Sequence, residues 1–144
     1  MMKFSMNERN PGYAEDPGVI RFGGRYLMYY SVPPCEGKNG WGIAIAESSD
    51  LLNWKYLCEI PHDGSILAPE LPWEQECIEA PAACIHNDKI YMFYAGAYNN
   101  CPQQIGCAVS SDGRQYLFFR ETTTMEKPGI SPAKKSSGRE ICQH

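Results

Sequence analysis

EDPGVIRFGGRYLMYYS, residues 15–31, recurs in altered form as EAPAACIHNDKIYMFYA, residues 79–95. Each copy places a carboxylate directly before a segment that begins with proline and ends in aromatic residues. The copies begin 64 residues apart, an offset that also pairs Pro17 with Pro81. Repeats of roughly 20–50 residues are typical of solenoids, propellers and arrays, and a slightly longer unit suits a propeller blade with an inserted loop.

The residues around the two copies predict an all-β chain. Short runs rich in β-branched and aromatic residues alternate with Gly, Asn, Asp and Pro, which break strands. Gly23-Gly24 and Asn87-Asp88 fall at equivalent places and tolerate the positive φ of a hairpin turn. Residues 67–81 contain three prolines and are expected to form a long connecting loop. Each unit then reads as four strands, which is the plan of a propeller blade.

Composition narrows the classes of partner and cofactor. The net charge is −4, with 13 Lys and Arg scattered among 17 Asp and Glu, so nucleic acid is not expected. No apolar run is long enough to span a membrane, and no signal peptide is seen, which favours a cytoplasmic location. The seven cysteines form no CxxC pair, and no phosphate loop or metal motif occurs, so neither a cofactor nor a metal is expected.

The repeat, together with the WGIAIAESSDLLNW segment at 41–54, resembles the five-bladed β-propeller glycosidases, especially family 43 and its relatives in families 32, 62 and 68. The resemblance covers about residues 10–119 and implies a partial five-bladed propeller of about two to two and a half four-stranded blades. It predicts a glycosidase domain over 1–120, with blade units at about 15–78 and 79–120. The remainder, 121–144, is polar and is expected to be a poorly ordered tail. A fragment of this kind is expected to expose blade faces through which it can self-associate, and to be inactive or poorly stable alone.

In the resembled families, a DP motif and an E(A/G)P motif open the inner strands of successive blades, and here Asp16 and Glu79 match them. Glycoside hydrolysis needs one protonated carboxylic acid and a second carboxylate across the sugar. By resemblance Glu79 is the general acid. Asp16 is either the carboxylate that tunes the pKa of that acid, which is the favoured role, or the base. Glu76 is a rival acid, because ECI resembles a family 32 motif, but the repeat offset favours Glu79.

Four further residues are candidate sugar contacts: Trp73, Trp41, Tyr98 and Gln104. Trp73 lies in the loop that delivers Glu79, and aromatic rings stack on sugars, although packing is the commoner use of tryptophan. Tyr98 and Gln104 lie in AYNNCPQQIG, residues 97–106, together with Gln103. This segment offers hydrogen bonds to sugar hydroxyls, or it is a plain polar loop.

Three classes of function stay open. The leading one is a glycoside hydrolase, or part of one, that acts on arabinofuranosides, xylosides or fructosides of plant-type oligosaccharides. The second is a β-mannoside phosphorylase-like propeller, which needs a cationic phosphate pocket; the arginines do not cluster along the sequence to suggest one. The third is a non-catalytic propeller fragment that binds carbohydrate.

Overall fold

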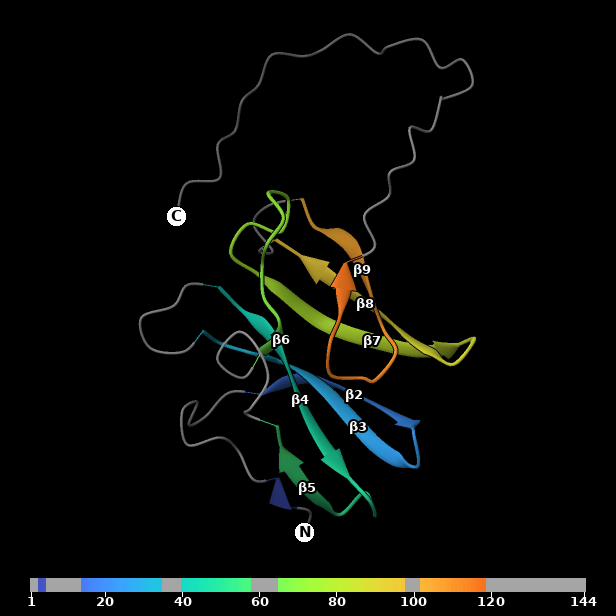
Figure 1. The fold of residues 1–144 in the computed structure, drawn as a ribbon. Coiled ribbons are helices and arrows are strands. Elements are labelled where there is room, and N and C mark those ends of the chain that lie inside the picture. The colour runs from blue at the N-terminus through green and yellow to red at the C-terminus, as the bar shows by residue number, and fades with distance from the viewer. Residues whose placement is uncertain (1–2, 5–13, 35–39, 58–64, 98–101, 119–144) are drawn as a thin grey trace, which may run out of the picture.

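The computed structural model describes residues 3–4, 14–34, 40–57, 65–97 and 102–118. Tyr98 and the tail expected at 121–144 lie outside these ranges. The described residues form ten strands and the turns between them (Figure 1), so the all-β prediction is confirmed. Within these ranges, no helix is long and apolar enough to cross a membrane.

The first sheet contains the first copy of the repeat. Its strands are β1 (Lys3–Phe4), β2 (Glu15–Phe22), β3 (Arg25–Val32), β4 (Gly42–Ser48), β5 (Asn53–Tyr56) and β6 (Ser65–Leu67). The order is β1-β5-β4-β3-β2, with β6 paired to β4. The predicted blade of four strands is therefore present as β2 to β5, and the short strands β1 and β6 add to it. They pair with β5 and β4, which satisfies backbone groups that a four-stranded sheet leaves open.

The second sheet contains the second copy and has the predicted four strands. They are β7 (Ile78–His86), β8 (Lys89–Gly96), β9 (Gln104–Ser110) and β10 (Leu117–Phe118), in the order β10-β9-β8-β7. All neighbouring strands are antiparallel. The loop predicted at 67–81 is shorter in the structure, because Leu67 ends β6 and residues 78–81 are already part of β7. The connection covers 68–77, with turns at 72–76.

Each copy begins with a hairpin whose turn has the same backbone conformation. Gly23 and Gly24 have φ of 57° and 78°, and Asn87 and Asp88 have φ of 48° and 56°. Two successive positive φ angles characterise the hairpin turn whose twist matches the flanking strands, and Gly, Asn and Asp adopt them at the least cost. The sequence-based prediction that the two hairpins are equivalent is confirmed.

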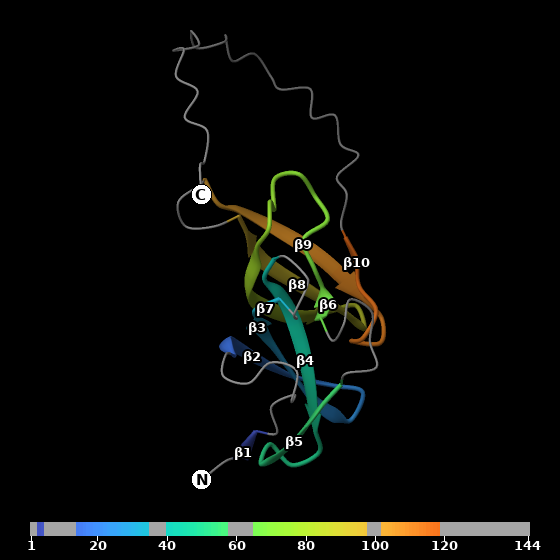
Figure 2. The ribbon, with the colours of Figure 1, turned by 90° about the vertical axis from the view of Figure 1, so that its left-hand side faces the viewer.

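The two sheets pack face to face, and the main core lies between them (Figures 1 and 2). Leu27 and Tyr29 of β3 contribute from the first sheet, and Met92 and Tyr94 of β8 from the second, and none is more than 1% exposed. Strand β7 contacts both β2 and β3, so the edge strands that begin each repeat lie beside one another. Packing of the sheets thus brings the two carboxylate motifs to the same seam.

Candidate active site

Both carboxylate motifs begin with a β-bulge. The pairing register shifts between Glu15 and Gly18 in β2, and between Glu79 and Ala82 in β7. Within the bulges Asp16 has φ of 52° and Ala80, its counterpart in the repeat, has φ of 53°. Each is followed by proline, which has no N–H to lose from the ladder and is tolerated at bulges. Bulges of this kind redirect side chains and are frequent next to active sites.

Ser31 joins the two bulges across the seam. Its hydroxyl accepts a hydrogen bond from the Ala80 amide at 2.9 Å and donates a long one, 3.5 Å, to Oδ2 of Asp16. The Ser31 side chain is buried in β3, whereas Asp16 is exposed. The structure therefore places the Asp16 carboxylate beside the residue that directly follows Glu79.

Glu79 is half-buried and has two side-chain partners. Gln103 donates from Nε2 to Oε1 of Glu79 at 3.1 Å and to the carbonyl of Ala97 at 3.2 Å. The Cys77 thiol also hydrogen-bonds Glu79. Burial, followed by the charge of Glu79 and this bond, raises the pKa of the Cys77 thiol to about 12, so the thiol stays protonated and donates. Two neutral donors thus orient the carboxylate.

The turn that leads into β7 is held by a second, fully buried carboxylate. Glu74 accepts hydrogen bonds at Oε2 from the amides of Glu70 and Leu71, at 2.7 and 2.8 Å. Its Oε1 accepts one from the Tyr94 hydroxyl at 2.6 Å. Burial first, and then the bond to Glu74, raises the pKa of Tyr94, which therefore stays protonated. Because a buried carboxylate without donors is very unfavourable, these bonds set the position of the turn.

Trp73 packs against the core at this turn. Its ring stacks on Tyr94 with a centroid separation of 6.1 Å and an interplanar angle of 13°. It also covers Gly96, where an added Cβ would lie 2.3 Å from the ring, so only glycine allows this approach. One face of the indole therefore serves packing, and sugar stacking on its other face stays a prediction.

The other predicted sugar contacts lie near the same turn. The Trp41 backbone bridges to it, since the Trp41 amide donates to the carbonyl of Glu76 at 3.0 Å and the Trp41 carbonyl accepts from Ile78 at 3.1 Å. The Trp41 side chain is half-buried. Gln104 is exposed at the start of β9, and its neighbour Gln103 is the residue that reaches Glu79. Their binding roles stay predictions.

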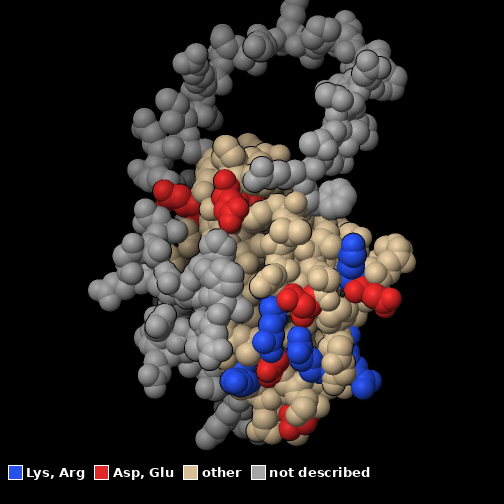
Figure 3. Space-filling model, in the orientation of Figure 1, with Lys and Arg blue, Asp and Glu red and all other residues tan. Residues whose placement is uncertain are grey.

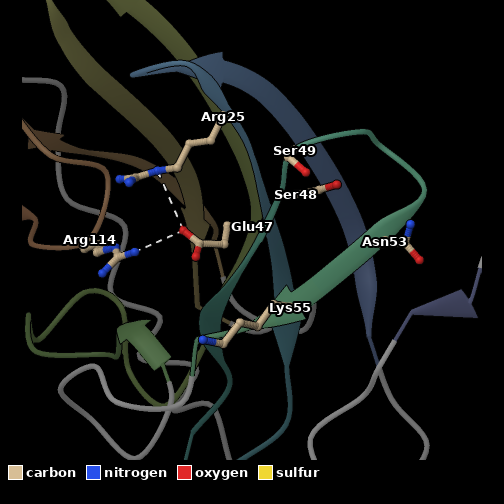
Figure 4. Close-up of a pocket in the computed structure, with 7 residues that line it drawn as sticks. All are labelled: Arg25, Glu47, Ser48, Ser49, Asn53, Lys55 and Arg114. Carbon is tan, nitrogen blue, oxygen red and sulfur yellow. Dashed lines mark hydrogen bonds and ion pairs between the residues drawn. The ribbon is translucent and has the colours of Figure 1, made fainter.

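A depression of about 360 Å³ lies at the opposite ends of the hairpins from Asp16 and Glu79 (Figure 4). Within it, Glu47 Oε2 lies 3.7 Å from Arg25 Nε and 3.0 Å from Arg114 Nη2. Two arginines therefore do cluster, contrary to the expectation from the sequence, because the sheets bring together positions 89 residues apart. Figure 3 shows basic and acidic side chains intermixed on this face. Arg114 follows β9 in the second sheet and Glu47 lies near the end of β4 in the first, so this ion pair links the two sheets.

The turns that follow β4 and β9 are capped by aspartates. Asp50 accepts from the amides of Leu52 and Asn53, and Asp112 from those of Arg114 and Gln115. Hydrogen bonds from the backbone amide and the side chain of Asn53 are the main reason that the pKa of Asp50 lies well below its usual range. These contacts support the structural role expected for such turns. In the described parts of the chain, no group of three His, Cys, Asp or Glu side chains is placed to hold a metal ion.

The structure adds four residues that position Asp16, Glu79 or the turn before β7. These are Ser31, Gln103, Cys77 and Glu74. The repeat offers a signal for Ser31, because its counterpart is Ala95 and a polar residue replaces an apolar one. Glu74 gives no such signal in the sequence, where it is one of several acidic residues in a loop. Only its burial and its three donors reveal its function.

Residues 8–139 match the family model described as the glycosyl hydrolases family 32 N-terminal domain. The chain belongs to this family. No curated protein matches the sequence. Family 32 is one of the relatives that the sequence resembles, and the resemblance to propeller glycosidases is thus confirmed.

Solved structures show the same fold. Fructan 1-exohydrolase IIa from Cichorium intybus is 19% identical, with a TM-score of 0.63 over 89% of this chain and 23% of its own. The GH43_1 enzyme from Xanthomonas citri, complexed with xylotriose, is 22% identical, with a TM-score of 0.58 over 74% of this chain and 31% of its own. The α-L-arabinanase of Cellvibrio cellulosa is 20% identical, with a TM-score of 0.56 over 74% and 34%.

This family 32 chain therefore spans about a third or less of the length of these structures. Its two sheets correspond to part of a β-propeller, as predicted. The similarity at such low identity concerns the fold, and the catalytic assignment has to be argued from the chain's own residues.

Proposed function

We propose that the chain forms part of a glycoside hydrolase in which Glu79 is the general acid and Asp16 the second acidic group. The observation that carries the proposal is the seam between β2 and β7, where one hydroxyl, that of Ser31, contacts both Asp16 and the residue after Glu79. Family membership supports hydrolysis of O-glycosidic bonds as the reaction class.

The surroundings of the two carboxyl groups differ. Glu79 is half-buried beside the Cys77 thiol and the Gln103 amide, whereas Asp16 is exposed to water. Glycosidases use two carboxyl groups whose environments separate their roles. The favoured role of Asp16 is to tune the acid and orient the substrate, and the alternative is that it acts as the base.

Glu79 is a better candidate than Glu76 for the acid. Glu76 is exposed and lies in the turn before β7, while Glu79 lies on the strand itself, which holds it rigidly. The proposed substrates are arabinofuranosides, xylosides or fructosides. The comparison structures are a fructan hydrolase, an arabinanase and an enzyme bound to xylotriose, which supports this range.

The phosphorylase alternative receives no support from the site. Arg25, Arg114 and Lys55 line the depression at the far ends of the hairpins, where the two arginines are paired with Glu47. A phosphate held there is remote from Glu79. The hydrolase is therefore the function that we propose.

The test is to titrate arabinobiose, xylobiose and 1-kestose into the chain, following backbone amide shifts by NMR and release of reducing sugar. We expect one of the three to shift the amides of Asp16 and Ala80. Where turnover is measured, Glu79→Gln is expected to lower it by about 10²–10⁴-fold, the usual contribution of a general acid.

Glu76→Gln is the matched control, since it makes the same change three residues earlier at an exposed position. It is expected to leave binding and turnover nearly unchanged. Equal losses in the two variants, or sugar-induced shifts confined to the Glu47 end of the sheets, would argue against the assignment of Glu79.

A further inference from the structure

Gln103 contacts the candidate acid with only one end of its side-chain amide. Its Nε2 lies 3.1 Å from Glu79 Oε1 and 3.2 Å from the carbonyl oxygen of Ala97. Both neighbours are acceptors, so the nitrogen of the amide has to face them, and the orientation of the group is fixed. The two contacts use both N–H bonds of Nε2. The amide oxygen of Gln103, Oε1, is left to accept from another group.

That oxygen is open to a ligand. Gln103 is exposed, directly before β9, and in the described parts of the chain no group donates a hydrogen bond to its Oε1. An amide oxygen only accepts, so whatever binds to it must bring a donor. A sugar hydroxyl is such a donor. The structure therefore holds a hydroxyl acceptor directly beside Glu79.

The Gln103 amide is held rigidly. Glu79 is in β7 and Gln103 precedes β9, with β8 between these strands, so the contact crosses a distance of roughly 10 Å between strand axes. Only two long side chains can meet across it. The second anchor, Ala97, is buried, and its amide donates to the carbonyls of Glu74 and Cys77 at 3.1 and 3.0 Å. Groups fixed in this way recognise a ligand at a low cost in conformational entropy.

The order of the strands shows which part of a substrate Gln103 faces. Strand β7, with Glu79, lies between β2, which carries Asp16, and β8, beyond which Gln103 lies (Figure 1). In a glycosidase the sugar that is cleaved sits between the two acidic groups, and the acid gives its proton to the oxygen of the leaving group. Gln103 is on the side of Glu79 away from Asp16. It is therefore on the side of the leaving group.

We propose that Gln103 selects the leaving group: while its Nε2 holds Glu79, its Oε1 accepts from a free hydroxyl next to the glycosidic oxygen. One hydrogen bond and the width of an amide separate this acceptor from the acid. Oxygens on two neighbouring carbons of one sugar can bridge that span, with one bonded to each side chain. The inference rests on the proposed function, because it requires Glu79 to protonate the glycosidic oxygen.

The proposed substrates differ in this hydroxyl. In β-1,4-linked xylobiose the glycosidic oxygen is on C4 of the leaving sugar, and the neighbouring C3 carries a free hydroxyl. In α-1,5-linked arabinobiose and in 1-kestose the glycosidic oxygen is on a CH₂ group, and the next carbon carries no free hydroxyl. We therefore expect Gln103 to favour leaving groups that are joined through a ring oxygen position with a free hydroxyl beside it, as in xylobiose.

The experiment compares xylobiose with an analogue that lacks the 3-hydroxyl of the reducing-end sugar. Dissociation constants come from the NMR shifts of the Asp16 and Ala80 amides. In the unaltered chain the analogue is expected to bind roughly 3–10-fold more weakly, the usual effect of one neutral hydrogen bond. In Gln103→Met, which keeps the length of the side chain and lacks the amide, the two ligands are expected to bind equally.

Gln115→Met is the matched control, because it makes the same change at an exposed position at the other end of the second sheet. It is expected to keep the full difference between the two ligands. Comparison of two ligands in two proteins isolates the direct contact, since a mere displacement of Glu79 weakens both ligands alike. Arabinobiose and 1-kestose should respond to Gln103→Met as the analogue does. The amide spectrum of each variant checks that it is folded.

Three results would overturn the proposal. The first is equal binding of xylobiose and the analogue by the unaltered chain. The second is a difference that Gln103→Met preserves, and the third is a difference that Gln115→Met abolishes as well. Each of these leaves the proposed function standing, provided that Glu79→Gln lowers turnover. If no sugar shifts the amides of Asp16 and Ala80, the proposed function and the role of Gln103 are both wrong.

Discussion

The two sheets share a backbone plan but differ in what their equivalent residues do. Both copies of the repeat have a bulge before proline and a hairpin turn with two positive φ angles. Tyr29 is nevertheless fully buried where Phe93 is 42% exposed, and Ser31 forms hydrogen bonds across the seam where Ala95 has no side-chain polar group. One sequence pattern thus yields a packing unit in one sheet and an exposed face in the other.

The energetic role of a residue in these sheets therefore depends on what packs against it and not on its place in the strand pattern. Apolar burial stabilises in proportion to the area removed from water, so the same ring contributes little until a second sheet covers it. Four experiments test this difference between the two sheets.

Truncation of the equivalent aromatic residues is expected to give the largest difference. Tyr29→Ala leaves a cavity and removes the hydrogen bond from the Tyr29 hydroxyl to the Gly113 carbonyl, so we expect a loss of about 3–5 kcal/mol in the free energy of unfolding. Phe93→Ala, at an exposed position, should cost less than about 1 kcal/mol. Urea unfolding of dilute samples measures both, and similar losses would contradict the comparison.

Glu74 distinguishes the second sheet, because the turn that leads into β7 depends on its buried carboxylate. Glu74→Ala leaves the amides of Glu70 and Leu71 and the Tyr94 hydroxyl without their acceptor. We expect a loss of about 3 kcal/mol in urea unfolding, from the cost of unsatisfied buried groups. Glu76→Ala, in the same turn but exposed, serves as the control. No difference between these variants would show that the buried carboxylate is dispensable.

Exchange of the residues at the seam tests the polar difference between the repeats. Ser31→Ala removes the acceptor of the Ala80 amide and should cost about 1–2 kcal/mol. The Ala80 amide should then exchange with deuterium faster, as NMR can follow. The reciprocal change, Ala95→Ser, should leave that exchange rate unaltered. If the Ala80 amide stays equally protected without Ser31, the hydroxyl does not hold the seam.

The smallest effect is expected from acid, which acts on the capped turns of both sheets. Hydrogen bonds from Asn53 lower the pKa of Asp50. At Asp112, partial burial raises the pKa, but hydrogen bonds from the amides of Gln115 and Arg114 lower it. The pKa of Asp112, like that of Asp50, is therefore below its ordinary value. A carboxyl with a lowered folded pKa stabilises above its unfolded pKa of about 4, and this stability is lost as the pH falls through the folded pKa.

The melting temperature of the unaltered chain should therefore decrease as the pH is lowered from neutral toward strong acid. The double substitution Asp50→Asn and Asp112→Asn should make this decrease shallower. Asp88→Asn, in the turn between β7 and β8, is the control and should preserve the slope. If the melting temperature falls with the same slope in all three proteins, the aspartate caps are not the cause of the pH dependence.

Much of the local structure could be predicted because it depends on short-range chemistry. Gly23-Gly24 and Asn87-Asp88 tolerate positive φ, and proline after Asp16 and Ala80 allows a bulge, so hairpins and strands follow from neighbours in sequence. The candidate acid Glu79 was also found this way, through the repeat. The short strands β1 and β6 could not be predicted, since two or three residues form a strand only where an edge already exists.

The all-β class, the repeat of the strand unit, the turns and the two carboxylate motifs follow from the amino-acid sequence, because periodicity and turn chemistry are local. Only the tertiary structure brings Ser31 to Ala80 and Arg114 to Glu47 across the two sheets, and Gln103 to Glu79 within the second sheet. The contacts between sheets exist because apolar burial has pressed one sheet against the other, and no spacing along the chain specifies that packing.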